Sequence, residues 1–388
     1  MIDLPPLDNP ELKVSPYLDV RFRYERRLDR DFFEPKADNR SDFLTRLRPG
    51  VKLQYGKEWS GEFQYQLAHD EIFRPGLTLS DEASDLNLAF VKFKDKNYEV
   101  TFGRQKINIG SERLIGSLEW TMVGRSFDGV RVTTKNWDAF AFKVGVAAPM
   151  PRKTKIVGGT YTSSLGLSSL IFKSDDQPAF PTDHWTLSHL YQKQFGKWAY
   201  DAEAAVQAGH MSGKKLQAWA LHLAATYSFN KTTKGFLEFN AASGGSNADN
   251  VYTFDNLLPT NHKFYGSMDL QAWKNMQEIA FGVEHKFDAK LSGKANYRVF
   301  SLRDASDAWY GAGGGPNAGG FGTFVDPTGT SGRDIGNEFN LEFSYKHSAT
   351  TTFSGGFGIF SPGGFVKKLN GGSANTQYWF YLMTQFKF

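Results

Sequence analysis

The chain ends on 375-NTQYWFYLMTQFKF-388, a stretch in which the character of the side chains alternates at every second position. Neighbouring side chains of a β-strand point to opposite faces, so the stretch predicts a strand with one strongly apolar face. The apolar face would carry Tyr378, Phe380, Leu382, Thr384, Phe386 and Phe388, and the other face Gln377, Trp379, Tyr381, Met383, Gln385 and Lys387.

The same alternation recurs along the chain, for example in 17-YLDVRFRYER-26, 200-YDAEAAVQAG-209 and 337-NEFNLEFSYKHS-348. Segments of about 10 residues are long enough for a tilted strand to cross the hydrocarbon layer of a membrane. We predict about eighteen strands from this pattern, at 14–28, 41–56, 59–70, 85–95, 97–105, 126–135, 137–148, 154–164, 166–173, 184–195, 198–210, 216–229, 234–242, 270–287, 290–301, 337–347, 350–360 and 376–388.

The composition favours strands over buried helices. The 388 residues include 34 Phe, 16 Tyr and 9 Trp, yet the mean hydropathy is −0.44, so the apolar residues are dispersed among polar ones. No apolar run reaches the length of about 18 residues that a transmembrane helix needs. The absence of Cys excludes disulfides and thiolate metal sites, and the net charge of +4 gives no reason to expect a nucleic-acid partner.

Short and long connections alternate between the predicted strands. Short turns such as GKEW and KDKN contrast with long segments at 29–40, 71–84, 106–125, 243–269, 302–336 and 361–375. This layout is typical of an outer-membrane β-barrel with short periplasmic turns and long extracellular loops. The aromatic last strand with its terminal Phe also resembles the signal that the outer-membrane assembly machinery reads.

We therefore predict an all-β fold, a transmembrane antiparallel β-barrel formed by residues 1–388 as one domain, with 1–12 as a lead-in. A soluble sandwich, whose charged faces would point to water, is the alternative. A soluble barrel could not bury Arg21, Arg23, Glu25, Arg46 and Arg48 in its core. Residues 1-MIDLPPLDNP-10 lack the apolar core of a signal peptide, which leaves a cytosolic protein or a mature form with an added start Met. The barrel prediction favours the mature form, in the bacterial outer membrane.

Two segments resemble the alginate export family of outer-membrane barrels. They are 103-GRQ-105 together with 112-ERLIGSLEWTMVGRSFDGVRV-132, and 254-FDNLLPTNHKFYG-266. The resemblance implies a monomeric 18-stranded barrel whose electropositive lumen passes an anionic uronate polysaccharide outward, with loops that fold in to gate it. This chain is shorter than the best-known alginate exporter, so its loops or turns must be reduced.

Arginine is suited to a path for such a substrate, because guanidinium groups bind carboxylates through paired hydrogen bonds and stay charged at physiological pH. A conduit needs several weak sites rather than one tight site. By strand phase and by the resemblance, the candidates for the path are Arg21, Arg23, Arg46, Arg48, Lys52, Arg104, Arg125, Arg131, Lys294 and Arg298. The phase of Arg104 is ambiguous, since Phe102 shares it.

Acidic residues on the same faces would balance these cations inside the lumen. The predicted counter-charges are Asp19, Glu25, Asp128, Glu203, Glu278 and Glu342. A barrel lumen is ordinarily polar and salt-bridged, so each arginine taken alone could be structural. The cluster on the first two strands favours a substrate path.

Three loops carry features that bear on function. The segment 102–131 combines arginines with Glu112, Glu119 and Asp128, which predicts a loop folded against the lumen wall and fixed by ion pairs. The acidic loop with Asp249 and Asp255 could hold Ca²⁺, although it lacks the regular spacing of a calcium loop. The glycine-rich segment 310–324 is no phosphate cradle and predicts a mobile external loop over the pore.

Two other functional classes remain as alternatives. A barrel enzyme would need a Ser–His or Asp–His group at the outer rim, but the chain has no HExxH or GxSxG motif, and only His262 lies inside a motif. A general anion-preferring or small-solute porin is the other alternative. Besides the anionic saccharide, the expected partners are outer-membrane lipids and a periplasmic secretion complex.

Overall fold

The computed structural model describes residues 11–33, 38–74, 77–147, 153–176 and 181–388. Within these residues, 19 strands form one sheet, and eighteen of them close into an antiparallel barrel. The first and last strands pair with each other, which removes every open sheet edge. The barrel strands are β1 (Leu12–Leu28), β2 (Arg40–Tyr55), β3 (Trp59–Arg74), β4 (Leu77–Lys94), β5 (Tyr98–Gln105), β6 (Arg125–Thr134), β7 (Trp137–Ala147), β8 (Lys155–Ser163), β9 (Gly166–Asp175), β10 (Thr182–Phe195), β11 (Trp198–Met211), β12 (Lys214–Ser228), β13 (Thr233–Ala242), β15 (Met276–Lys286), β16 (Leu291–Ser301), β19 (Asp334–Lys346), β20 (Thr351–Pro362) and β21 (Gln377–Lys387).

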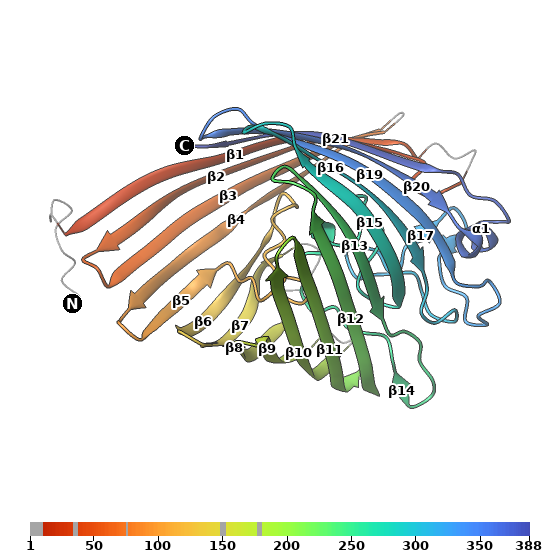
Figure 1. The fold of residues 1–388 in the computed structure, drawn as a ribbon, viewed down its shortest axis with the longest axis horizontal. Coiled ribbons are helices and arrows are strands. Elements are labelled where there is room, and N and C mark those ends of the chain that lie inside the picture. Colours follow the sequence, from red (N-terminus) through yellow and green to blue (C-terminus); the bar gives the residue numbers. More distant parts are fainter. Residues whose placement is uncertain (1–10, 34–37, 75–76, 148–152, 177–180) are drawn as a thin grey trace.

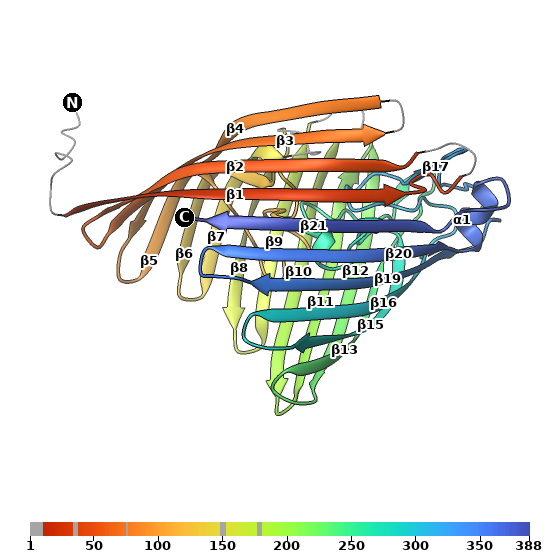
Figure 2. The same ribbon diagram turned by 90° about the horizontal axis from the view of Figure 1, so that it is seen from above.

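The remaining elements lie in the long connections. They are β14 (Asn250–Val251), the 3₁₀ helix η1 (Asn261–Lys263), the hairpin of β17 (Ala318–Gly319) and β18 (Gly322–Thr323), and α1 (Gly364–Leu369). Figures 1 and 2 show α1 and β17 at one end of the barrel, and the start of β1 and the C-terminus at the other. No helix among the described residues is long and apolar enough to span a bilayer.

The two faces of the barrel wall have the polarity that the alternation predicts. On β1 and β2, Phe22 is 42% exposed and Leu47 is 37% exposed, whereas Arg21 and Arg46 are only 6% and 1% exposed. Apolar side chains therefore point outward to lipid and charged side chains point into the lumen. This arrangement confirms the prediction of a transmembrane barrel and rules out the soluble sandwich.

Two long loops fill one side of the lumen with an apolar core. The loop at 106–124 and the loop at 243–275 pack against inward-facing residues of β6 to β9 and of β11 to β13. The loops are joined by backbone hydrogen bonds, from the Gly116 N–H to the Leu258 carbonyl and from the Leu258 N–H to the Leu114 carbonyl, both 2.9 Å. A Cβ at Gly116 would come within 2.1 Å of the Thr260 hydroxyl, so the close approach of the two loops requires glycine.

A second apolar core lies at the end of the barrel that carries the long loops. It joins Phe32 of the first loop, Trp309 and Phe324 of the loop at 302–333, Phe365 of α1 and Trp379 of β21. The glycine-rich segment 310–324 thus contains the β17–β18 hairpin and lies between two buried aromatic side chains, Trp309 before it and Phe324 at its end. The sequence predicted none of this local structure.

The predicted strand boundaries need two corrections. The segment 71–84, predicted as a loop, mostly continues β3 and β4, whose backbones pair from Glu71 with Ser80 and from Ile72 with Leu79. Beyond the lipid a hairpin no longer needs apolar alternation, so its polar sequence resembled a loop. The strand predicted to begin at residue 270 begins at Met276, because the preceding backbone pairs with other loops, as in the 2.9 Å bond from the Ala272 N–H to the Tyr310 carbonyl.

Candidate functional site: the constriction at the loop 106–124

Four arginines form a cluster on the inner wall, midway along β1 and β2. Arg21 and Arg46 are cross-strand partners, with Arg23 and Arg48 nearby, and all four are 6% exposed or less. Like charges placed directly opposite destabilise a sheet. The cluster therefore depends on groups that reach it from elsewhere.

Carboxylates of the wall supply part of the compensation. The Arg23 guanidinium lies 2.7 Å from the Glu25 carboxylate, and the Arg46 guanidinium lies 3.3 Å from the Asp19 carboxylate. Glu25 also accepts a 3.2 Å hydrogen bond from the Trp379 indole N–H. Both acids occupy the counter-charge positions that strand phase predicts.

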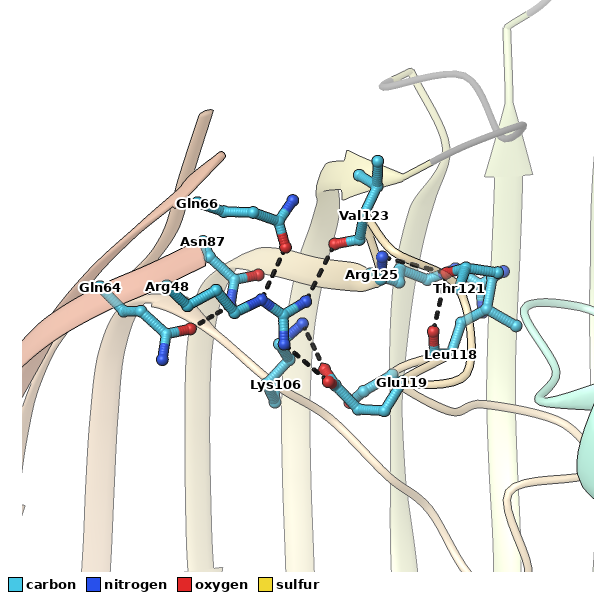
Figure 3. A network of polar contacts seen from close by, with 12 residues as sticks. Arg48, Gln64, Gln66, Asn87, Lys106, Leu118, Glu119, Thr121, Val123 and Arg125 are labelled. Carbon is cyan, nitrogen blue, oxygen red and sulfur yellow. Dashed lines mark hydrogen bonds and ion pairs between the residues drawn. The ribbon is translucent and has the colours of Figure 1, made fainter. Parts of the chain in front are cut away.

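The tip of the loop 106–124 supplies the rest through its backbone, and Figure 3 shows one of these contacts, that of Arg48 with Val123. Arg21 donates to the carbonyl of Glu119 and Arg23 to the carbonyl of Trp120, each at 2.7 Å. Arg48 donates to the carbonyl of Val123 at 3.1 Å. The loop tip is thus held against the arginine cluster on the inner wall, and we call this place the constriction.

The Glu119 carboxylate is the centre of the ionic network in Figure 3. It lies 2.7 Å from the guanidinium of Arg48, 2.7 Å from the Lys106 ammonium and 3.6 Å from Arg46. Burial alone would raise the pKa of Glu119, but Lys106, Arg48 and Arg46 outweigh burial and hold the pKa well below its usual range. Burial, with the help of Arg48, lowers the pKa of Lys106 to about 8, although Glu119 opposes the shift.

An aromatic contact with the loop at 243–275 also fixes the loop 106–124. The Trp120 ring stacks on the His262 imidazole at 3.8 Å with an interplanar angle of 6°, and the Arg23 guanidinium lies 4.1 Å from the Trp120 ring. His262 in turn contacts the Asp269 carboxylate at 2.9 Å. Burial would raise the pKa of Asp269, but His262 and Arg27 lower it. His262 thus packs between the two inner loops, in contact with Trp120 and Asp269.

A cavity lies on each side of the constriction. The cavity toward the long loops has a volume of 440 Å³. It is lined by Arg23, Arg27, Arg30 and Arg40 among other residues, together with the acids Glu25, Asp42, Asp70 and Asp269. The cavity toward the short turns has a volume of 460 Å³. It is lined by Lys92, Lys106 and Arg131 together with Glu62 and Glu99. Both volumes are in the range of small-molecule sites. A solute crossing the barrel on this side would meet cations before, at and after the constriction.

Several other predicted residues anchor the loops to the wall. Arg125 donates to the carbonyls of Gly116 and Pro259 at 2.9 and 3.2 Å. Arg298 donates to the Phe264 carbonyl at 2.6 Å and pairs with Glu278. These contacts show that both arginines join the inner loops to the wall.

Further predicted residues fall into three different surroundings. Glu203 is buried and accepts a hydrogen bond from the Ser111 hydroxyl, and Glu342 accepts one from Ser267 at 2.5 Å. Lys294 lies 5.5 Å from the Phe236 ring, Lys52 lies 5.2 Å from the Tyr17 ring, and Arg131 makes a paired contact with Asp138 at 2.7 and 2.9 Å.

Arg104 and Asp128 pair with each other at 2.6 and 2.8 Å. They are cross-strand partners in the phase of Phe102 and Val130, which are 69% and 37% exposed. The pair therefore lies on the outward-facing phase of the wall and not on the inner wall with the arginine cluster. This position resolves the ambiguous phase of Arg104, and the prediction of Asp128 as a counter-charge inside the lumen is wrong.

Sequence reasoning missed Lys106, Trp120 and Arg113 as site residues. Arg113 is buried in the loop 106–124, where it contacts Glu238 at 2.9 Å and the Phe264 ring at 4.0 Å. All three residues lie in a loop, where the period-2 alternation gives no direction for a side chain. Arg113 and Trp120 lie in the segment 112–132 that resembles the alginate export family, but no spacing pattern in that segment distinguishes them as site residues.

The two acids considered for a calcium site, Asp249 and Asp255, lie in different surroundings. Asp255 is buried 2.6 Å from the Lys173 ammonium, whereas Asp249 is exposed. Burial would raise the pKa of Asp255, but Lys173, His184 and Lys274 lower it to about 2. In the described parts of the chain, no group of three or more metal-binding side chains is gathered.

A closed antiparallel barrel with a lipid-facing apolar surface, an ionic lumen and inward-folded loops defines a channel of the bacterial outer membrane. The family model described as alginate export matches residues 14–164 and 182–380, so the chain belongs to the alginate export family. This is a family of channels and not of enzymes. A search of curated proteins finds no match.

Solved channels of Pseudomonas aeruginosa share the fold. OccK5 (OpdH) is 13% identical, with 97% of this chain and 98% of that chain covered and a TM-score of 0.63. The outer membrane protein OprD is 12% identical, with 97% and 93% covered and a TM-score of 0.63. OccK2 (OpdF), solved in complex with glucuronate, is 12% identical, with 97% and 96% covered and a TM-score of 0.61.

Proposed function

We propose that this channel passes acidic saccharides of the uronate type, as a polymer strand or its oligomers, along the arginine cluster of β1 and β2. The observation that carries the proposal is the cluster of Arg21, Arg23, Arg46 and Arg48 at the constriction, with cavities on both sides that are lined by cations and acids together. The family description and the glucuronate complex of OccK2 support a uronate as the substrate class. The conducting unit is a single barrel, because the path lies inside one barrel.

The loop carbonyls give the proposed path its mechanism. Arg21 and Arg23 donate to the carbonyls of Glu119 and Trp120, and each guanidinium has further N–H groups. A uronate carboxylate is a stronger acceptor than a neutral carbonyl. Substrate carboxylates would exchange with these carbonyls one at a time, so that binding is strong enough for entry and weak enough for release.

Ion selectivity in planar bilayers tests the proposal. We expect anion preference, with block by oligouronates and not by neutral oligosaccharides of the same length. Replacement of Arg21, Arg23, Arg46 and Arg48 by Gln removes four charges and should abolish most of the preference. Replacement of the same four by Lys keeps the charge and loses the planar donor geometry. It should keep anion preference and weaken block by oligouronates by about tenfold.

Two results would contradict the proposal. Cation preference of the unmodified channel would exclude an arginine-lined path for anions. Anion preference without selective block by oligouronates would instead indicate a general anion-preferring porin. Limited proteolysis of the variants, compared with the unmodified barrel, shows whether the loop 106–124 remains folded.

A further inference from the structure

We propose that a hollow on the outer face of the barrel, next to the short turns, binds an anionic phospholipid of the periplasmic leaflet. The hollow has a volume of 750 Å³ and spans β12, β13, β15 and β16. Small residues at Ala225, Gly235 and Ala295 form its floor, and Leu237 and Phe281 rise around it, 59% and 52% exposed. The surface is apolar and of the size that one or two acyl chains fill.

Aromatic side chains mark the depth of this hollow in the membrane. Trp198, Tyr227 and Phe229 border it where β11 and β12 meet the short turns. The Trp198 and Tyr227 rings lie 4.8 Å apart, and the Tyr227 and Phe229 rings lie 5.2 Å apart. Aromatic girdles of this kind sit at the level of lipid headgroups. The hollow therefore begins at the headgroup level and runs into the hydrocarbon layer.

Lysines gather at the headgroup end. Lys193, Lys197, Lys231 and Lys290 are exposed on or beside the turns next to the hollow, and the Lys197 ammonium lies 5.9 Å from the Tyr227 ring. The turns at 196–197, 229–232 and 287–290 contain one acid, Asp288, whose carboxylate accepts backbone hydrogen bonds from Lys290 and Leu291 at 2.7 and 2.8 Å.

These lysines form no ion pair among the described residues. Across the described ranges of the chain, the lysines that form ion pairs are Lys92, Lys106, Lys155, Lys173 and Lys263. None of the four lysines beside the hollow is among them. Clustered basic residues next to a membrane attract anionic headgroups.

Charge and shape together define the occupant. An acyl chain fits the apolar hollow, and a phosphate or phosphoglycerol headgroup fits the lysine edge. The short turns face the periplasm, so the lipid comes from the periplasmic leaflet. The inference does not depend on the proposed substrate, because the hollow lies on the outer face and the arginine cluster lies in the lumen.

Native mass spectrometry of the detergent-solubilised channel tests this site, with phosphatidylglycerol and phosphatidylethanolamine of the same acyl chains as probes. We expect the unmodified channel to retain phosphatidylglycerol about tenfold more tightly. The triple variant K193Q/K197Q/K231Q should lose this preference. The variant A225F/A295F, which fills the hollow, should lose retention of both lipids.

Matched controls carry the same changes elsewhere. K57Q/K94Q/K96Q removes three exposed lysines from other short turns, and A139F/A141F adds the same bulk to the outward face of β7. Both should behave like the unmodified channel. Equal affinity for the two lipids in the unmodified channel, or unchanged retention by A225F/A295F, would overturn the proposal. Channel conductance and heat-dependent gel mobility report whether each variant forms the barrel.

Discussion

The carboxylate of Glu119 sets the balance of charge at the constriction, since Lys106 and Arg48 both lie 2.7 Å from it. Replacement of Glu119 by Gln leaves these cations and Arg46 without their shared partner. We expect anion preference to rise, because the constriction gains one net positive charge. Reversal potentials across a salt gradient measure the change.

Glu112→Gln is the matched control for that variant. Glu112 lies on the same loop but pairs with Lys263 at 3.0 Å, away from the arginine cluster. Its neutralisation should leave selectivity nearly unchanged. An equal effect of both substitutions would show that the general charge of the loop, and not the Glu119 network, governs selectivity.

We expect a pH dependence of ion selectivity from Lys106. Burial and Arg48 lower its pKa to about 8, below the usual value near 10.5, so the ammonium is charged at pH 7 and mostly neutral at pH 9. The arginines stay charged throughout this range. Anion preference should therefore fall as pH rises through 8, and a Lys106→Met variant should lack this step. A step of the same size in Lys106→Met would assign the titration to another group.

At the scale of one element, the loop 106–124 is held by stacking as well as by charge. Trp120→Ala removes the 3.8 Å stack on His262 and the contact with Arg23. We expect a higher and noisier single-channel conductance, because the loop tip loses its contact with His262 and moves more freely in the lumen. Trp185→Ala is the control, since Trp185 is 49% exposed on the outer face. Conductance like that of the control would mean that the arginine contacts suffice to hold the loop.

The loop at 243–275 is anchored by the pair of Lys173 and Asp255, 2.6 Å apart and buried. Lys173→Met leaves a buried carboxylate without its main partner, which costs about 3–5 kcal/mol. Limited proteolysis should then cut this loop faster while the barrel stays intact. Lys155→Met breaks an exposed pair with Asp176, worth about 0–1 kcal/mol, and should not change the cleavage. Equal protection in both variants would show that the apolar core alone holds the loop.

At the scale of the whole molecule, selectivity depends on the summed field of the lumen as well as on contacts. The Debye length falls from about 30 Å at 0.01 M salt to about 3 Å at 1 M. We expect anion preference to weaken with ionic strength and to persist in part, because the buried arginines are screened least. Selectivity that does not change with salt would point to local binding alone.

The residues themselves determined the barrel. Alternation in stretches such as 375–388 gave the strands, and the phase of Arg21 and Phe22 assigned the lumen and lipid faces. The physical reason is that period-2 geometry and the cost of charge in lipid act locally, residue by residue. The errors, at 71–84 and 270–275, lie where a strand leaves the lipid or where a loop is apolar.

Only the tertiary structure decided what the loops do inside the barrel. Lys106, Glu119 and Trp120 meet residues of β1, β2 and the loop at 243–275 that are far apart in the sequence. A loop has no fixed period, so its sequence does not state which side chains turn toward the wall. The closing of the chain into a barrel brings these groups together, and for that reason the sequence predicted an arginine-lined lumen but not the constriction that these arginines hold.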